Sequence, residues 1–159
     1  MPKANSSTEA QKFEFLNVVE VVELALEIFT ENDIKFSAKE PEIIANFDRS
    51  QLIRIITNLV KNAVQSIPEE RTPQISVQLF SETTDVVITV KDNGCGITET
   101  IEDKIFEPKF TTKTSGMGLG LPMIKNIIET YNGSIEFTSI IDKGSQFTVR
   151  FPKQFPDEV

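Results

Sequence analysis

The sequence predicts an α/β fold, because segments with the strand period of two alternate along the chain with segments that have the helical period of 3.6. The predicted order is strand, helix, two strands, helix, two strands, a glycine-rich segment, helix and two strands. With 159 residues, 39% of them hydrophobic, the chain has the size of one domain with a buried core. Residues 1–11 are small and polar, and we expect them to form a disordered lead.

The first half of the chain carries three strands and two helices. In order, we expect a strand over Lys12–Leu16, a helix over Val18–Thr30 with Asn17 as N-cap, strands over Ile34–Ser37 and Glu42–Phe47 separated at Pro41, and a helix over Gln51–Ile67. Asp48 or Ser50 caps this second helix, and Pro68 ends it.

The second half carries two hairpins and one helix. We expect strands over Gln74–Phe80 and Asp85–Lys91, a helix over Leu119–Tyr131, and strands over Ser134–Ile141 and Gln146–Phe151. Asn132 and Gly133 are typical of a helix C-cap.

A polar stripe runs along the predicted helix Gln51–Ile67, which is otherwise apolar. At about 100° per residue, its members fall within one arc: Gln51, Arg54, Asn58, Lys61, Asn62 and Gln65. Asn58 and Asn62 stand four residues apart, one above the other. Periodicity alone leaves two interpretations open, a solvated helix face and a functional site.

Five of the seven glycines lie between Lys91 and Gly120, at Gly94, Gly96, Gly116, Gly118 and Gly120. The last three open a helix, where exposed N–H groups and the helix dipole favour an anion such as phosphate. No Gly-Lys-Ser/Thr follows, so this is not a P-loop, and no strand precedes it as in a dinucleotide-binding motif. An amide oxygen from Asn62 suits Mg²⁺, which shares its other ligands with phosphates and water. The combination favours a Mg²⁺-nucleotide over a plain glycine-hinged loop.

Composition excludes several other functions. A net charge of −8 and a pI near 4.7 argue against nucleic acid and anionic membranes as partners. The absence of histidine excludes Ser-His-Asp and Cys-His mechanisms, and the single cysteine excludes an internal disulfide. No apolar run approaches the eighteen residues of a membrane span.

Five motifs resemble a known family. NLVKNA from Asn58, DNGCGI from Asp92, IFEPKFTTK from Ile105, GMGLGL from Gly116 and KGSQFTVRF from Lys143 resemble, in order, the N, G1, F, G2 and G3 boxes of the histidine-kinase catalytic and ATP-binding domain. Gyrase, MutL and the anti-sigma-factor serine kinases belong to the same superfamily. The resemblance covers residues 12–152, which leaves 153–159 as a C-terminal tail. The sequence FEPKFTTK within the third motif is similar to that of nitrogen-regulation sensor kinases.

The resemblance implies a two-layer α/β sandwich of the Bergerat type, in which a mixed sheet carries three main helices on one face. It implies that Asn62 ligates Mg²⁺ with Asn58 beside the phosphates, and that Asp92 accepts a hydrogen bond from the adenine amino group. Gly94, Gly96 and Ile97 would line the base, and Thr148 would support a water that bridges to adenine.

The resemblance also implies a flexible lid, which Phe106 and Phe110 would anchor. Its phosphate-facing residues would be Lys113, Gly116, Gly118, Leu119 and Gly120. Lys113 is equally well explained as a solvated lysine.

The function implied is that of one half of an enzyme. The chain would bind Mg²⁺-ATP in the cytoplasm and donate the γ-phosphoryl group to a histidine on a dimerisation domain of the same parent, with a response-regulator receiver domain as the next partner. Without a histidine it should not autophosphorylate alone. A free-standing serine kinase of the anti-sigma type and a non-catalytic nucleotide switch are the alternatives. Gln65 and Lys109 depart from common family residues, and membrane anchoring of the parent is left open.

Overall fold

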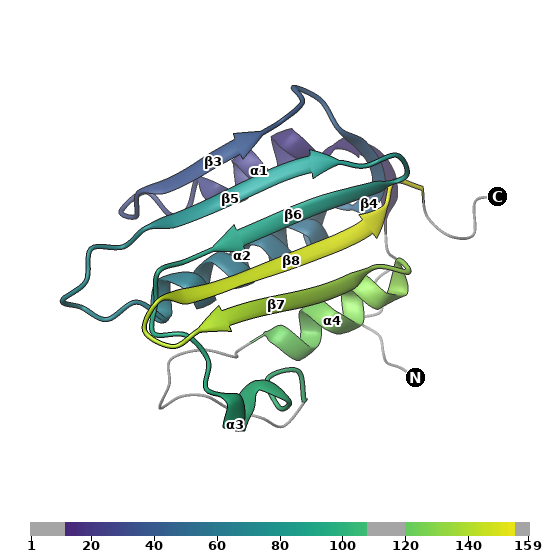
Figure 1. Cartoon of the computed structure of the whole chain (residues 1–159). Coiled ribbons are helices and arrows are strands. Elements are labelled where there is room, and N and C mark those ends of the chain that lie inside the picture. Colours follow the sequence, from purple (N-terminus) through teal and green to yellow (C-terminus); the bar gives the residue numbers. More distant parts are fainter. Residues whose placement is uncertain (1–11, 108–119, 155–159) are drawn as a thin grey trace, which may run out of the picture.

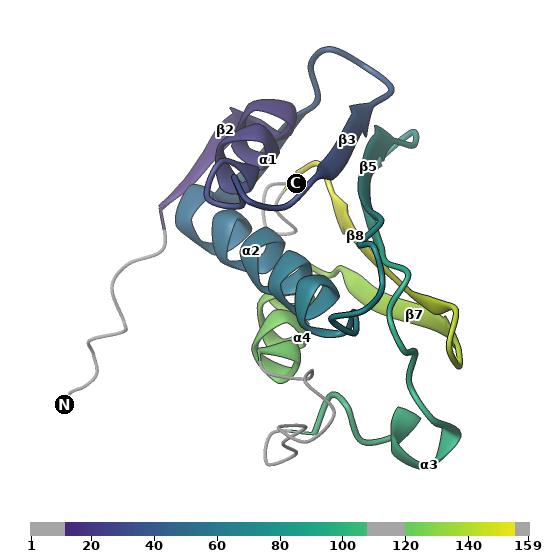
Figure 2. The same cartoon turned by 90° about the vertical axis from the view of Figure 1, so that its left-hand side faces the viewer.

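The structure, a computed structural model that describes residues 12–107 and 120–154, is a sheet with helices packed on one of its faces (Figures 1 and 2). The large sheet contains β3 (Ile34–Ala38), β5 (Ile75–Ser81), β6 (Asp85–Lys91), β8 (Gly144–Pro152) and β7 (Ser134–Ile140), in that spatial order. The helices are α1 (Val18–Leu26), α2 (Arg49–Gln65), the short α3 (Glu99–Glu102) and α4 (Leu121–Thr130). A separate two-stranded sheet pairs β2 (Phe13–Asn17) with β4 (Ile44–Asp48).

The large sheet is mixed. β3 pairs with β5 in parallel, whereas β5, β6, β8 and β7 pair with their neighbours in antiparallel register. The helices α1, α2 and α4 lie together on one side of this sheet, and the other side is open (Figure 2). The prediction of a two-layer α/β sandwich with three main helices on one face is therefore confirmed.

Side chains along each central strand alternate between the helix-covered face and the open face. Val86, Ile88 and Val90 of β6 belong to the core between sheet and helices, while Lys91 is exposed. On β8, Phe147 and Val149 belong to the same core. Because the strand period is two, the next position after Val90 on the covered face is Asp92, directly beyond the end of β6.

Capping decides where the helices begin and end. Asn17 Oδ1 accepts the N–H of Val19, and Asp48 Oδ1 accepts the N–H of Gln51, so Asp48 rather than Ser50 is the N-cap of α2. At the end of α4, Asn132 has φ of +61° and Gly133 donates to the carbonyl of Ile128 at 2.8 Å. This is a Schellman cap, in which Asn132 rather than Gly133 supplies the left-handed residue.

Two elements differ from the prediction. α1 ends at Leu26, four residues before the predicted end at Thr30, and turns follow it. Phe29 still packs against the core, so the apolar pattern continues, but the N–H groups of Glu27 and Phe29 bond three residues back, to Leu24 and Leu26, as in turns. α3 was not predicted, since its four residues are too few for a periodic signal.

The chain ends are only partly described. Residues 1–11 and 155–159 lie outside the described residues, so the predicted lead and most of the predicted tail stay predictions. Lys153, placed in the tail, is bonded to the domain: its N–H donates to Thr84 and its carbonyl accepts from Asn46. In the part of the chain that the structure describes, no helix is long and apolar enough to cross a membrane.

Candidate functional site

The polar stripe of α2 is not a uniformly solvated face. Arg54, Lys61 and Gln65 are exposed, but Asn62 is buried, with 2% of its surface accessible. Among the described residues, Asn62 Nδ2 has no hydrogen-bond partner. A buried amide donor without a partner costs about 1 to 3 kcal/mol, which makes Nδ2 a candidate contact for a bound ligand.

Asn58, one turn before Asn62, lies against the beginning of α4. Its Nδ2 donates to the carbonyl of Arg54 at 2.8 Å, which leaves Oδ1 directed away from its own helix. A Cβ atom at Gly120 would lie 2.6 Å from that Oδ1, so the two residues are in contact. Gly120 is the N-cap residue of α4, has φ of +86°, and supplies no side chain to bond the first N–H groups of the helix.

Asp92 lies at the C-terminal end of α2. Its Oδ1 accepts hydrogen bonds from the N–H of Gly94 at 2.7 Å and of Ser145 at 3.2 Å. The hydroxyl of Ser66, the C-cap residue of α2, lies beside this carboxyl group and lowers its pKa, while it donates to the carbonyl of Ala63 at 2.8 Å. Asp92 thus faces the helices, and only 5% of its surface is accessible.

Burial dominates the electrostatics of Asp92. Desolvation raises the pKa of its carboxyl group above the ordinary 3.8, and the bonds from Gly94 and Ser145 together with the nearby Ser66 hydroxyl oppose this shift without cancelling it. A desolvated carboxylate is a strong acceptor for a neutral N–H donor, since charge-assisted hydrogen bonds are about twice as strong as neutral ones.

The segment after Asp92 packs against the β7–β8 hairpin. Gly96 has φ of +81°, and a Cβ atom there would lie 2.6 Å from the carbonyl oxygen of Ile140. Ile97 is buried and donates its N–H to the hydroxyl of Ser139 at 2.7 Å. The glycine at position 96 is therefore required by contacts within the chain, and its contact with a base stays a prediction.

Thr148 does not lie near Asp92. Its neighbours Phe147 and Val149 both point into the core, so the side chain of Thr148 is on the open face, on the opposite side of the sheet from the Asp92 carboxylate. The residue of this hairpin that does reach Asp92 is Ser145, which is buried and bonds to the hydroxyl of Ser139 at 2.9 Å. The last motif thus lies on the hairpin that contacts Asp92, but the residue in contact is Ser145, three positions before Thr148. Because side chains alternate along a strand, these two residues lie on opposite faces of the sheet.

The structure describes only the N-terminal end of the predicted lid, up to residue 107. Phe106 is half-buried, packs on Phe137 with ring centroids 6.1 Å apart, and has the ammonium group of Lys125 5.8 Å from its ring centre. The other predicted lid residues lie outside the described residues, and their roles stay predictions: Phe110, Lys113, Gly116, Gly118 and Leu119.

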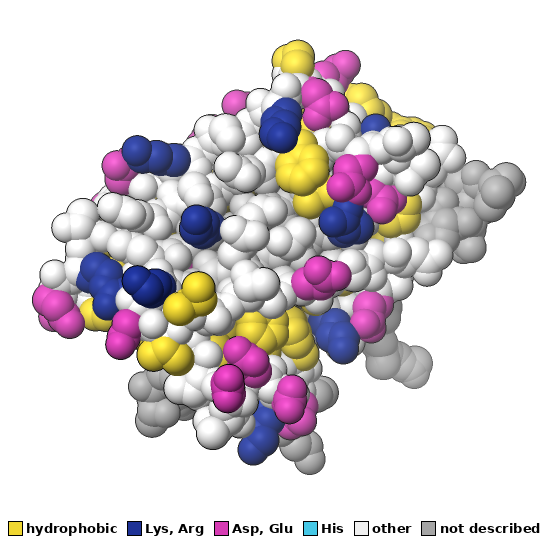
Figure 3. Space-filling view, in the orientation of Figure 1, with side chains coloured by type: hydrophobic (Ala, Val, Ile, Leu, Met, Phe, Trp, Pro, Cys, Tyr) yellow, Lys and Arg dark blue, Asp and Glu magenta, His cyan; other side chains and the backbone are white. Residues whose placement is uncertain are grey.

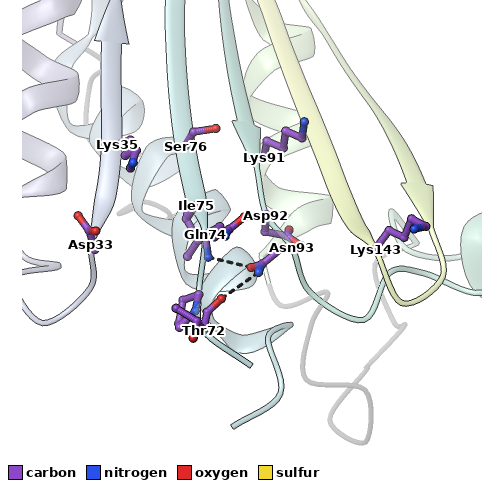
Figure 4. A pocket seen from close by; sticks show the side chains of 11 residues that line it. Asp33, Lys35, Thr72, Gln74, Ile75, Ser76, Lys91, Asp92, Asn93 and Lys143 are labelled. Carbon is purple, nitrogen blue, oxygen red and sulfur yellow. Dashed lines mark hydrogen bonds between the residues drawn. The ribbon is translucent and has the colours of Figure 1, made fainter. Parts of the chain in front are cut away.

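A hollow of about 660 Å³ lies at the end of the sheet where β5 begins and β6 ends (Figure 4). Lys35, Lys91 and Lys143 line it together with Asn93 and Gln74. Dark-blue basic side chains surround this end of the open face in Figure 3. Asp92 also lines this hollow, whereas Asn58 and Asn62 do not, so the hollow meets the residues on the helix-covered face only at Asp92.

Three residues of the site escaped the sequence analysis. The hydroxyl of Ser66 lies beside the Asp92 carboxyl group, the N–H of Ser145 donates to that group, and the guanidinium group of Arg71 donates to the carbonyl oxygens of Asn93 and Gly94. Serine and arginine are common in loops, so composition carried no signal for them. For Ser145, the lysine-glycine turn directly before it in the last motif was the available clue.

The comparisons with known proteins agree with this architecture. Residues 47–154 match the family described as histidine kinase-, DNA gyrase B-, and HSP90-like ATPase. The catalytic domain of histidine kinase ThkA superposes with a TM-score of 0.81 at 30% identity, covering 90% of this chain and 97% of that one. These findings define the class as an ATPase domain with the histidine-kinase fold. The chain belongs to the histidine kinase-, DNA gyrase B- and HSP90-like ATPase family, and the resemblance inferred from its motifs is confirmed.

The similar curated proteins are much longer than this chain. Sporulation kinase A of Bacillus subtilis is 40% identical over 121 residues, which are 76% of this chain and 20% of that protein. Sensor histidine kinase ZraS of Salmonella typhimurium is 41% identical over 123 residues, 77% of this chain and 26% of that protein. The chain thus spans about a fifth to a quarter of these relatives. A similarity to nitrogen-regulation kinases in particular stays a prediction.

Proposed function

We propose that this chain binds Mg²⁺-ATP between α2, the segment after β6 and the beginning of α4, and donates the γ-phosphoryl group to a histidine on a separate dimerisation domain. The observation that carries the proposal is that α2 lies beside two complementary surfaces. The hydroxyl of Ser66, its C-cap residue, lies beside the Asp92 carboxyl group, and Asn58, near the middle of the helix, contacts Gly120. Eight residue steps along the helix separate Asn58 from Ser66, about 12 Å at 1.5 Å per residue, which suits a base beside Asp92 and phosphates beside Asn58.

Asp92 is the proposed discriminator of the base. Its carboxylate accepts a hydrogen bond from the exocyclic amino group of adenine, whereas guanine presents a carbonyl oxygen at that position and would repel it. The buried position of Asp92 supports this role, because a site built to bond an amino group leaves the acceptor unpaired when that group is missing. The protein donors Gly94 and Ser145 both bond to Oδ1.

The phosphate end fits a magnesium ion held mainly by the nucleotide. Among the described residues, no group of three or more Asp, Glu, Cys or His side chains could hold a metal. The buried Nδ2 of Asn62 lacks an acceptor there and would donate to a phosphate oxygen, whereas Mg²⁺ would be ligated by Oδ1 of the same amide together with phosphate and water oxygens. Mg²⁺ would neutralise charge on the phosphates, while Asn62 binds it and Asn58 orients the adjacent phosphate.

The N-terminus of α4 is the proposed contact for the phosphate oxygens. Gly120 offers no capping side chain, so within the described residues the N–H groups of Leu121 and Met123 have no bond from the N-cap and would donate to an anion, whereas Pro122 has no N–H. The chain supplies positioning and charge stabilisation, and the attacking nucleophile comes from elsewhere, because the sequence contains no histidine. The names of the relatives, and the small share of each that this chain covers, support the proposal that the chain is part of a longer sensor kinase. The structure of histidine kinase ThkA has been solved in complex with response regulator protein TrrA.

Labelled ATP tests the proposal. The chain is incubated with and without the purified histidine-bearing domain of its own parent, and the product is treated with acid. We expect label only when both domains are present, and we expect acid to remove it, because phosphohistidine is acid-labile. Acid-stable label on a serine would favour an anti-sigma-type kinase. Tight ATP binding without transfer to any acceptor would favour a nucleotide switch, and either result would contradict the proposal.

A further inference from the structure

Hydrogen bonds join the segment after β6 to the loop between α2 and β5. Arg71 Nη1 donates to the carbonyl oxygens of Asn93 at 2.6 Å and Gly94 at 2.9 Å. The side chain of Asn93 accepts the N–H of Gln74 at 2.8 Å and donates to the carbonyl of Thr72 at 2.9 Å (Figure 4). The loop thus holds the backbone directly after Asp92 at several points.

One peptide group connects Arg71 to Asp92. The carbonyl of Asn93 and the N–H of Gly94 belong to the same peptide unit; the first accepts from Arg71, and the second donates to Asp92 Oδ1 at 2.7 Å. A cation at the carbonyl polarises the peptide and strengthens its N–H as a donor, since hydrogen bonds in a chain reinforce one another at low dielectric. The rigid guanidinium group also fixes the plane of this peptide.

We infer that Arg71 is a positioning residue for base recognition, which orients the Asp92 carboxylate through the Asn93–Gly94 peptide. With Oδ1 held by Gly94 and Ser145, the other carboxylate oxygen keeps a defined direction toward a ligand. The inference rests on the proposed role of Asp92 as acceptor for the adenine amino group. Arg71 itself touches protein backbone, so it acts on the nucleotide only through Asp92.

Two variants separate a positioning role from a general loss of structure. Arg71→Met removes both the charge and the bonds, and Arg71→Lys restores a cation without the planar fork. Arg150→Met is the matched control, because Arg150 forms an ion pair with Glu82 across the strands and lies near the opposite end of β6. All measurements are made on folded protein well below its unfolding midpoint.

The first measurement needs no nucleotide. The amide proton of Gly94 is followed by NMR, because its chemical shift reports the strength of the bond to Asp92. We expect a clear upfield shift in Arg71→Met, a smaller one in Arg71→Lys and none in Arg150→Met. An unchanged Gly94 amide in Arg71→Met would overturn the inference.

The second measurement is base selectivity. Calorimetry compares ADP with IDP, whose base carries a carbonyl in place of the amino group. We expect the ratio of affinities to fall about three- to tenfold in Arg71→Met, the range for one weakened hydrogen bond, and to recover partly in Arg71→Lys. In the Asp92→Asn background, Arg71→Met should leave the ratio unchanged.

The two measurements distinguish a failure of the proposed base recognition by Asp92 from a failure of the inference about Arg71. Equal affinities for ADP and IDP in the unaltered protein would overturn the proposed base recognition, and with it this inference as a specificity device, whatever the Gly94 shift. A selective unaltered protein whose ratio does not change in Arg71→Met would overturn the inference alone.

Discussion

Gly120 and Asn58 are in contact across the interface between α4 and α2, where a Cβ atom on Gly120 would lie 2.6 Å from Asn58 Oδ1. The backbone of Gly120 has φ of +86°, a conformation that side chains disfavour. The close approach therefore has two causes, one steric and one conformational, and both require glycine at this position.

Gly120→Ala should lower the free energy of unfolding by about 1 to 3 kcal/mol, because it adds both backbone strain and a clash with Asn58. Urea denaturation measures the loss. In the double variant with Asn58→Ala the clash is relieved but the strain remains, so the combined loss should be smaller than the sum of the single losses. Strictly additive losses would show that the two residues do not touch.

Asn62→Ala should remove the Mg²⁺ dependence of nucleotide binding while the fold persists. The side chain has no partner for Nδ2 among the described residues, so its removal should change the free energy of unfolding by no more than about 1 kcal/mol. Calorimetric titrations with and without Mg²⁺ make the comparison. Gln65→Ala, an exposed position one turn further along the same stripe, is the control and should leave the Mg²⁺ dependence intact.

Asp92→Asn should weaken ADP binding by about 1.5 to 3 kcal/mol, the value of a hydrogen bond to a charged group, and reduce the preference for ADP over GDP. Calorimetry with both nucleotides measures the effect. Thr148→Val is the control, because Thr148 lies on the open face of the sheet. Equal affinities of the unaltered chain for both nucleotides would contradict the role of Asp92.

The raised pKa of Asp92 also predicts a pH dependence of stability. Because the folded state holds the proton more tightly than the unfolded state, the contribution of Asp92 to the free energy of unfolding falls as pH rises from 3.8 through the folded pKa. Asp92→Asn lacks this loss, so without nucleotide it should gain stability relative to the unaltered chain across that window. Denaturation at several values between roughly pH 3.5 and pH 7 tests the sign; a constant difference would contradict it.

Asp48→Ala should lower the free energy of unfolding by about 1 to 2 kcal/mol at neutral pH, because the N-cap of α2 is lost. Burial raises the pKa of Asp48, but hydrogen bonds from Lys12, Ser50 and Gln51 outweigh it and hold the pKa below 3.8. The stabilisation is therefore present above 3.8 and is lost as pH falls through the folded pKa. Denaturation series of both proteins measure this: the difference between them should shrink in acid, and a difference that grows would refute the sign.

The sequence predicted the helix that organises the site but not how the site is completed. Apolar periodicity located α2, and its spacing placed Asn58 and Asn62 on one stripe, because both properties depend only on neighbours within a few residues. That Asn58 contacts Gly120 depends on the beginning of α4, which is more than fifty residues away along the chain, and that Asn62 is buried depends on the packing of the whole fold.

The hairpin β7–β8 shows the same limit at single-residue scale. The motif from Lys143 onward indicated that this hairpin contributes to the base end, yet the predicted contact, Thr148, faces away from Asp92. Which face a strand residue occupies depends on register and on what covers the sheet, and one position changes the face.

By itself, the sequence determined the elements other than the short α3, the α/β class, the order of the five motifs and the absence of a histidine acceptor, since each is a property of composition or local spacing. Only the tertiary structure decided that β3 lies parallel to β5, that the helices cover one face, and that Asp92 is bonded by Gly94 and Ser145 with Arg71 one peptide away. These contacts join segments distant in sequence, and packing of the whole core selects them from many local alternatives.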